Sequence, residues 1–269
     1  MSHARVQGRQ LYYELHGSHP GPVLVLCVGV GGSCRGWLPL QVPEFSRERR
    51  TLIFDYPGVG ESEAVDAPFT TADLADTTVA LLDALGVERA DVLGSFMGGM
   101  VAQELALRHP ERVERLALVG TYARPDAKRV TLLRQWQDLA RMNAPLEMFV
   151  RERILWTLQD ETLEQKDLIE SMVDFHSRDG APLTAAVFVR QCEACIGHDT
   201  LDRLRDVRQR TLVLCGGNDQ LTPPKFHRQL ADEIPNAQLV TLSYGGHAVM
   251  VESAESFNRT VAQFLADER

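Results

Sequence analysis

The chain has 269 residues, which is enough for one large α/β domain or for a core with an inserted subdomain. A hydrophobic fraction of 44% permits a sizeable buried core, and a formal net charge of −9 argues against nucleic acid or an anionic membrane as partner, because both would repel it. No apolar run approaches the length of a membrane span, the N-terminus lacks a secretory signal, and an odd cysteine count of 5 fits a reducing compartment. We therefore expect a cytoplasmic globular protein.

Short β-branched runs alternate with amphipathic segments of helical length, a pattern that predicts a mostly parallel sheet covered by helices. The expected strands are the two arms of a hairpin within Ala4–Leu15, then Val23–Val28, Thr51–Asp55, Ala90–Leu93, Val113–Val119, Thr211–Leu214 and Gln238–Leu242. The expected helices between and after them are Thr71–Leu85 (with Gly86 at its C-cap), Gly98–His109 and Ala254–Ala266.

Between residues 125 and 209 the pattern changes to helices without strands. The expected helices are Ala127–Met142, Leu146–Leu158, Leu163–His176, Leu183–Ile196 and Thr200–Val207. An all-helical block between two strands is typical of a lid over the carboxyl edge of a sheet. We therefore expect a core made of residues 1–122 and 210–269, with residues 123–209 as a helical cap.

Residues suited to catalysis follow the predicted strands at their carboxyl ends, the edge at which open α/β sheets bind ligands. Gly29–Gly32 follows the first buried strand, and such a loop can point backbone N–H groups into a cavity and stabilise an oxyanion. Asp219 and His247 follow the last two strands. A carboxylate and an imidazole on neighbouring loops can hydrogen-bond, which fixes the tautomer of the histidine and stabilises its protonated form.

The segment Gly94–Gly99 lies between a predicted strand and a predicted helix and has the glycine spacing of a nucleophile elbow, G-x-S-x-G. The flanking glycines are needed because that turn is strained and crowded. Here Gly94 and Gly98 flank Phe96 and not Ser95. The spacing therefore places Phe96 at the apex, and alternation along the strand points Ser95 away from the cavity that Phe96 enters.

Taken together, these motifs resemble the α/β-hydrolase superfamily, in its bacterial lactonase and esterase-like branch. The resemblance rests on the order of elbow, acid and histidine, on the helical insertion between the sixth and seventh core strands, and on the stretches Met100–Ala106 and His109–Val113. It implies an α/β-hydrolase fold, with a mostly parallel eight-stranded sheet flanked by helices and an inserted helical cap.

The same resemblance assigns the acid to Asp219, the base to His247, and the oxyanion-hole amides to Val30 and Met97. The chain departs from the family pattern at two positions. Val28 stands where the family often has histidine before the oxyanion loop, and Phe96 occupies the position of the nucleophile.

Three functional hypotheses follow. In the first, the protein is an enzyme for a small, mostly apolar carbonyl or ester-like substrate. His247–Asp219 is its general base and Phe96 an apolar wall, and the chemistry is non-covalent hydrolysis or a lyase, isomerase or cyclase-type reaction. In the second, it is a carboxylic ester hydrolase or lactonase that uses Ser95 after a rearrangement of the elbow. In the third, it is a non-catalytic protein that binds a small ligand.

Trp37, just after the glycine loop, is expected to contact the substrate at the mouth of the pocket. No metal or organic cofactor is expected, because no histidines and carboxylates recur at the spacing of metal ligands and Gly29–Gly32 lacks the dinucleotide-binding GxGxxG pattern. The expected partner is a small molecule, and the sequence leaves the oligomeric state open.

Overall fold

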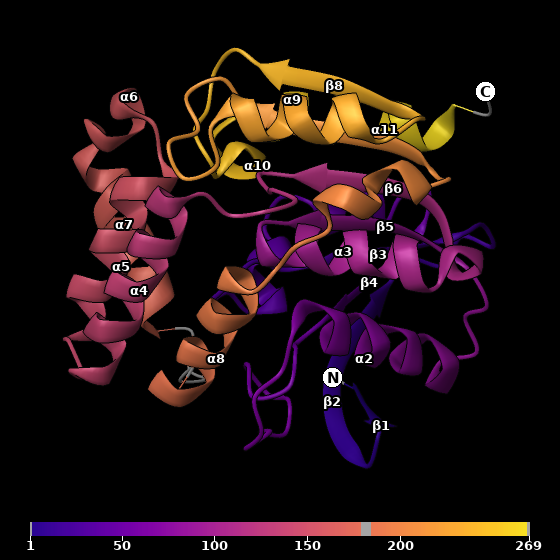
Figure 1. Ribbon diagram of the computed structural model, residues 1–269, viewed down its shortest axis with the longest axis horizontal. Helices are drawn as coiled ribbons and strands as arrows, with labels where there is room; N and C mark the ends of the chain where they lie inside the picture. The colour runs from indigo at the N-terminus through magenta and orange to yellow at the C-terminus, as the bar shows by residue number, and fades with distance from the viewer. Residues whose placement is uncertain (1, 179–183, 268–269) are drawn as a thin grey trace.

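The computed structural model describes residues 2–178 and 184–267. Its strands form one eight-stranded sheet in the order β1-β2-β4-β3-β5-β6-β7-β8, in which β3 to β8 run parallel and β2 is antiparallel to both of its neighbours (Figure 1). The mostly parallel eight-stranded sheet predicted from the sequence is thus confirmed. The strands are β1 (Ser2–Val6), β2 (Arg9–His16), β3 (Val23–Cys27), β4 (Arg50–Phe54), β5 (Ala90–Ser95), β6 (Val113–Val119), β7 (Arg210–Gly216) and β8 (Ala237–Leu242).

The central strands are buried on both faces, which explains why they are continuous apolar runs in the sequence. In β3, Val23 and Val25 contribute to one hydrophobic core, whereas Leu24 and Leu26 contribute to a second core on the opposite face of the sheet. Period-two alternation of side chains therefore builds two cores from one strand.

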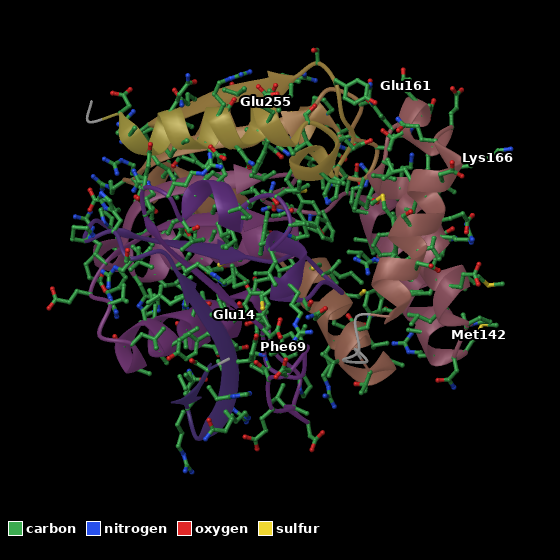
Figure 2. The ribbon with its side chains drawn as sticks, turned by 180° about the vertical axis from the view of Figure 1, so that it is seen from behind. Glu14, Phe69, Met142, Glu161, Lys166 and Glu255 are labelled. Carbon is green, nitrogen blue, oxygen red and sulfur yellow. The ribbon has the colours of Figure 1, made fainter. Side chains whose placement is uncertain are left out.

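Helices cover both faces of the sheet. The first core lies under α2 (Thr71–Ala84), α3 (Met97–Arg108) and α9 (Pro224–Glu233), and the second lies under α1 (Val42–Phe45) and α11 (Ala254–Ala266). Figure 2 shows the molecule from behind, with Glu255 on the outer side of α11. Helix α9 and the short helices α1 and α10 (Val249–Glu252) were not predicted from the sequence.

The segment between β6 and β7 is helical and forms a block beside one end of the sheet (Figure 1). The predicted helix Leu163–His176 corresponds to α7, but its start was wrong: α7 begins at Lys166, and Leu163 is the last residue of the short helix α6, which was not predicted. The predicted start of another helix, Leu183, lies outside the described residues. The helices of the block are α4 (Ala127–Arg141), α5 (Leu146–Thr157), α6 (Asp160–Leu163), α7 (Lys166–Arg178) and α8 (Ala185–Ile196), followed by a 3₁₀ helix at Leu201–Asp206. In the described parts of the chain, no helix has the length and apolarity required to cross a bilayer.

The turn from β5 into α3 brings three backbone segments into close contact. A Cβ added to Gly94 would overlap the carbonyl oxygen of Gly98, and one added to Gly98 would overlap the carbonyl oxygen of Cys27 at the end of β3. Both neighbours are backbone atoms held by the sheet or the helix, so neither can move aside cheaply. Glycine is therefore required at both positions for packing reasons.

This crowding predicts that Gly98→Ala destabilises the fold by about 3 kcal/mol or more, because the new methyl group forces strand and helix apart. Gly36→Ala is the matched control, since a Cβ at Gly36 meets no atom within 4 Å. Urea unfolding followed by circular dichroism measures both variants. An unchanged midpoint for Gly98→Ala would contradict the packing argument.

Candidate active site

Phe96 occupies the apex of the turn between β5 and α3, with φ of 48° and ψ of −109°. A bulky residue with positive φ is strained, at a cost of about 1–3 kcal/mol, and it persists only where its surroundings fix it. The amide of Phe96 donates to the carbonyl of Val119 at 3.0 Å, and its carbonyl accepts from Thr121 Oγ1 at 2.8 Å. The end of β6 thus holds the apex in place, at the position that the glycine spacing predicted.

Asp219 and His247 come together at the carboxyl ends of β7 and β8. His247 Nδ1 donates to Asp219 Oδ2 at 3.0 Å, and both side chains are buried. Thr222, which the sequence analysis did not identify, completes the arrangement: its amide and hydroxyl donate to the two Asp219 oxygens, each at 2.7 Å, and its Oγ1 lies 3.1 Å from His247 Nδ1. These contacts leave Nε2 of His247 as the nitrogen free to take up a proton.

The ring of Phe96 packs edge-on against the imidazole of His247, with 5.3 Å between centroids and 84° between planes. Tyr122 makes a similar contact on Phe96, at 5.9 Å and 81°. Gly120 lies next to His247 as well, where a Cβ would approach the ring to 3.0 Å. An aromatic ring therefore stands against the base at the place where the elbow presents its apical side chain.

Ser95 is not brought into contact with the base. It is the last residue of β5, is 7% exposed, and forms no hydrogen bond with His247. Within the described residues, the hydrogen-bond partners of the His247 ring are Asp219 and Thr222. The elbow therefore offers its benzyl group, and not a hydroxyl, to the imidazole.

Trp37 does not lie at the mouth of a pocket, where its place in the sequence predicted it. It is 4% exposed and belongs to the second hydrophobic core, with Phe45 and Phe257. The 3₁₀ turn Cys34–Trp37 directs this indole back toward the sheet face that α1 and α11 cover. The expectation of a substrate contact at Trp37 was therefore wrong, because the direction of the turn was not visible in the sequence.

The glycine loop after β3 is held by two side chains of the helical block. Arg153 of α5 donates through Nη2 to the carbonyl of Val30 at 2.7 Å and through Nη1 to that of Gly31 at 3.3 Å. The amide of Gly31 donates to Gln191 Oε1 of α8 at 2.8 Å. The peptide between Val30 and Gly31 is thus fixed at both its carbonyl and its N–H. Met97, the other residue assigned to the oxyanion hole, is the first residue of α3, where helical N–H groups have no partner inside the helix.

The helical block also contacts the loops that carry the acid and the histidine. Gln159 Oε1 accepts from Asn218 Nδ2 and from the amide of Gly245, each at 2.9 Å. Glu252 accepts two backbone N–H groups: its Oε1 accepts from that of Gln159 at 3.0 Å, and its Oε2 accepts from that of Gly246 at 2.6 Å. Neither Gln159 nor Glu252 has a sequence signature, because each is defined only by contacts between distant segments.

Two buried groups set the electrostatics of the site. Burial opposes ionisation of Asp219, but the charge and hydrogen bond of His247 outweigh it and lower the pKa of this carboxyl below its ordinary value. His227 of α9 is fully buried, accepts from the amide of Thr121 at 3.1 Å, and is close enough to Asp219 to feel its charge. Burial lowers the pKa of His227 to about 4, so this imidazole is neutral at neutral pH.

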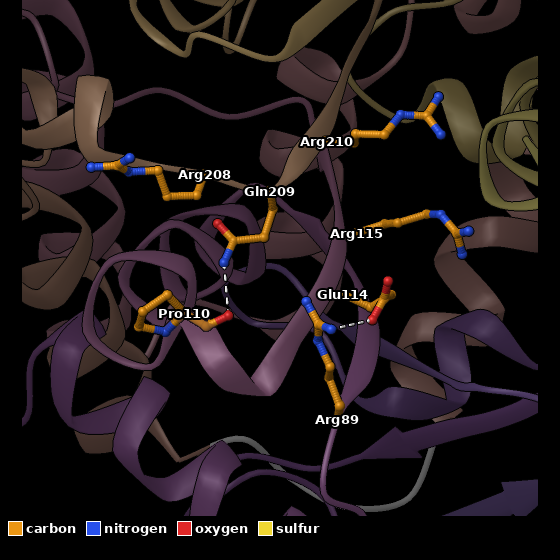
Figure 3. A pocket seen from close by; sticks show the side chains of 7 residues that line it. All are labelled: Arg89, Pro110, Glu114, Arg115, Arg208, Gln209 and Arg210. Carbon is orange, nitrogen blue, oxygen red and sulfur yellow. Dashed lines mark hydrogen bonds and ion pairs between the residues drawn. The ribbon is translucent and has the colours of Figure 1, made fainter. Parts of the chain in front are cut away.

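A separate hollow of about 280 Å³ lies at the opposite edge of the sheet, near the amino ends of β5, β6 and β7 (Figure 3). Its arginines include Arg89, paired with Glu114 at 2.8 Å, and Arg210, paired with Asp267 at 3.3 Å. The hollow shares no lining residue with the arrangement around His247. Over the part of the chain that the structure describes, no group of three or more His, Cys, Asp or Glu side chains is placed to hold a metal ion.

Comparison with known proteins identifies the family to which this fold belongs. The family model for the alpha/beta hydrolase fold matches residues 22–254. Proteins named "Putative carbamate hydrolase RutD" from Caulobacter sp. (strain K31) and Serratia proteamaculans (strain 568) are 33% and 31% identical, over 96% and 95% of this chain and 96% of each relative. The crystal structure of the enol-lactonase from Burkholderia xenovorans LB400 superposes with a TM-score of 0.89 at 28% identity, covering 99% of this chain and 100% of that one.

The lowered pKa of His227 predicts an acid-side loss of stability. In the unfolded chain a histidine takes up a proton near pH 6.5, but in the folded protein His227 does so only near pH 4. As the pH is lowered from about 6.5 to about 4, the unfolded chain binds one proton more than the folded protein. The free energy of unfolding therefore decreases over this range by about 1.4 kcal/mol per pH unit. His227→Gln keeps an acceptor for Thr121 and removes this titration, so its stability falls less steeply with pH. Urea unfolding at pH 7, 6 and 5 measures both slopes; equal slopes would refute the assignment.

Proposed function

Since the chain belongs to the α/β-hydrolase family, we propose that it is an enzyme that hydrolyses a small, mostly apolar carbonyl or ester-like substrate by general-base catalysis, without an acyl-enzyme. His247 is the base, Asp219 orients its imidazole and stabilises the protonated form, and Phe96 forms an apolar wall of the site. Helices α4 to α8 form the cap over this site. The hydrolase names of the relatives favour hydrolysis over the other reactions that a lone base supports.

The proposed reaction begins with water. His247 Nε2 removes a proton from a water molecule as the water oxygen attacks the substrate carbonyl carbon. The carbonyl oxygen becomes negatively charged and accepts hydrogen bonds from the amides of Val30 and Met97. When the tetrahedral intermediate collapses, the bond to the leaving group breaks and the leaving atom takes the proton back from His247. Asp219 stabilises the imidazolium throughout.

The observation that carries the proposal is the contact between the Phe96 ring and His247. A benzyl group has no atom that can attack a carbonyl, so the usual covalent step has no nucleophile at the apex. The pair of base and acid is nevertheless intact, with Nδ1 of His247 3.0 Å from Asp219 Oδ2. A buried, correctly paired base is useful for chemistry that needs proton removal alone.

The first test removes the base. His247→Ala is expected to reduce turnover of small aryl and alkyl esters by about 10²- to 10⁴-fold, which is the contribution that proton transfer in the transition state typically makes. A serine-directed fluorophosphonate is expected to leave the wild-type mass unchanged. A fluorophosphonate adduct on Ser95 would instead show that Ser95 is the nucleophile. Turnover that survives in His247→Ala would refute the role of the base.

The second test supplies the missing nucleophile. Phe96→Ser places a hydroxyl at the apex beside His247, and we expect hydrolysis of p-nitrophenyl acetate to rise by at least about a hundredfold, with a fluorophosphonate adduct at residue 96. Phe96→Ala is the matched control: it removes the same ring and is expected to give neither the rate increase nor the adduct. No gain in Phe96→Ser would show that the amides of Val30 and Met97 or the base are not placed for acyl transfer.

A further inference from the structure

Two side chains of the cap reach the glycine loop and have hydrogen-bond capacity left over. Arg153 binds the carbonyls of Val30 and Gly31, and Gln191 accepts from the amide of Gly31. The approach is close: a Cβ on Gly31 would lie 2.8 Å from both Arg153 Nη1 and Phe188 Cε2. The loop needs glycine here, with φ of 69°, so that these cap residues can pack on it.

The leftover donors are shielded from solvent. Arg153 Nε and Gln191 Nε2 are both buried, and neither has an acceptor within the described parts of the chain. Gln191 as a whole is 0% exposed. A buried donor without a partner is unfavourable, more so when it is charged, and two of them at one loop make that loop suited to bind an oxygen acceptor of a ligand.

The charge of Arg153 is likewise unbalanced. No described carboxylate pairs with its guanidinium, which binds only backbone carbonyls and lies 6.0 Å from the Phe188 ring centre. Arg151, two residues earlier on the same helix, pairs with Glu147 at 2.9 Å and Glu170 at 2.7 Å. The Arg153 side chain is half-buried with its Nε fully buried, and a charge in such surroundings is normally paired, which makes this guanidinium suited to bind an anion.

We propose that the substrate carries a carboxylate group and that Arg153 and Gln191 bind it from the cap side of Gly31. This inference rests on the proposed function, because it places the carboxylate beside the site at which His247 acts. A carboxylate accepts several N–H bonds and suits a guanidinium better than any neutral group. Phe149 and Phe188, whose rings are 4.7 Å apart, offer apolar surface to the rest of the molecule.

The position of Arg153 also limits the length of the substrate. Its Nη2 binds the carbonyl of Val30, the residue whose amide is proposed to stabilise the oxyanion. The carboxylate therefore lies within a few bonds of the reacting carbonyl. The substrate class is a short, mostly apolar carboxylic acid with a second, hydrolysable carbonyl group.

Calorimetric titration of the full chain tests the subsite without requiring turnover. The probes are hexanoate, phenylacetate and 3-phenylpropanoate, each compared with its neutral primary amide. At least one acid is expected to bind about tenfold or more tightly than its amide. Arg153→Met is expected to weaken binding of that acid by roughly 10- to 100-fold and to leave the amide unchanged, since a hydrogen bond to a charged group is lost. Gln191→Leu is expected to have a smaller effect in the same direction.

Arg151→Met is the matched control, because Arg151 lies on the same helix but faces Glu147 and Glu170; it should bind all probes like wild type. Arg153→Lys keeps the charge and is expected to retain part of the acid preference, which keeps the test decisive where Arg153→Met does not fold. Equal affinity for acids and amides, absence of binding by all three acids, or an equal loss in Arg151→Met would overturn the proposal.

Turnover separates this proposal from the proposed function. Comparison of mono-p-nitrophenyl glutarate with p-nitrophenyl butyrate should show a preference for the charged ester that Arg153→Met removes. Binding of acids through Arg153 without any turnover would support the subsite and refute the hydrolase proposal. Turnover of both esters that depends on His247 but not on Arg153 would support the hydrolase proposal and refute the carboxylate subsite.

Discussion

The close packing of the turn between β5 and α3 against the end of β3 is the constraint on which the site depends. Three backbone segments meet there with no space for a Cβ at Gly94 or Gly98. That crowding fixes which residue lies at the apex, and the apex residue is the one that faces the histidine. A shift by one residue would put Leu93 and Met97 at positions that only glycine can occupy. The absence of a hydroxyl at the apex is therefore a consequence of packing as much as of the residue type at position 96.

The strain at Phe96 has a clear structural origin. Its positive φ is unfavourable for a bulky side chain. Hydrogen bonds between its backbone and Val119 and Thr121 hold the residue in this conformation, and its ring is held by contacts with Tyr122 and His247. The conformation is the one that an attacking hydroxyl would need, retained around a ring that cannot attack. The turn geometry used for acyl transfer is thus kept here without a side chain that could form an acyl-enzyme, and under the proposed function the same turn serves a base that acts on water.

Features with a local physical cause could be predicted from the sequence. The strands followed from apolar runs, the apex from glycine spacing, and the pairing of Asp219 with His247 from their places after neighbouring strands. Helix α9 was missed because its buried stripe is only Phe226, His227 and Leu230 among polar residues, although proline at its start is a typical helix signal. Contacts between distant segments, such as Thr222 with His247 or Gln191 with Gly31, have no local pattern, and the misplaced Trp37 shows that side-chain direction after a turn is also hidden.

Gln159 and Glu252 couple the position of the helical block to the loops that carry Asp219 and His247. Gln159 belongs to the helical block, yet it bonds to the loops that carry Asp219 and His247, and Glu252 binds the backbone amides of both Gln159 and Gly246. Any outward movement of the helical block must break these bonds and loosen the loops of Asn218 and Gly245. Under the proposed function, the loops that carry Asp219 and His247 are therefore fully held only when the helical block is closed over a ligand.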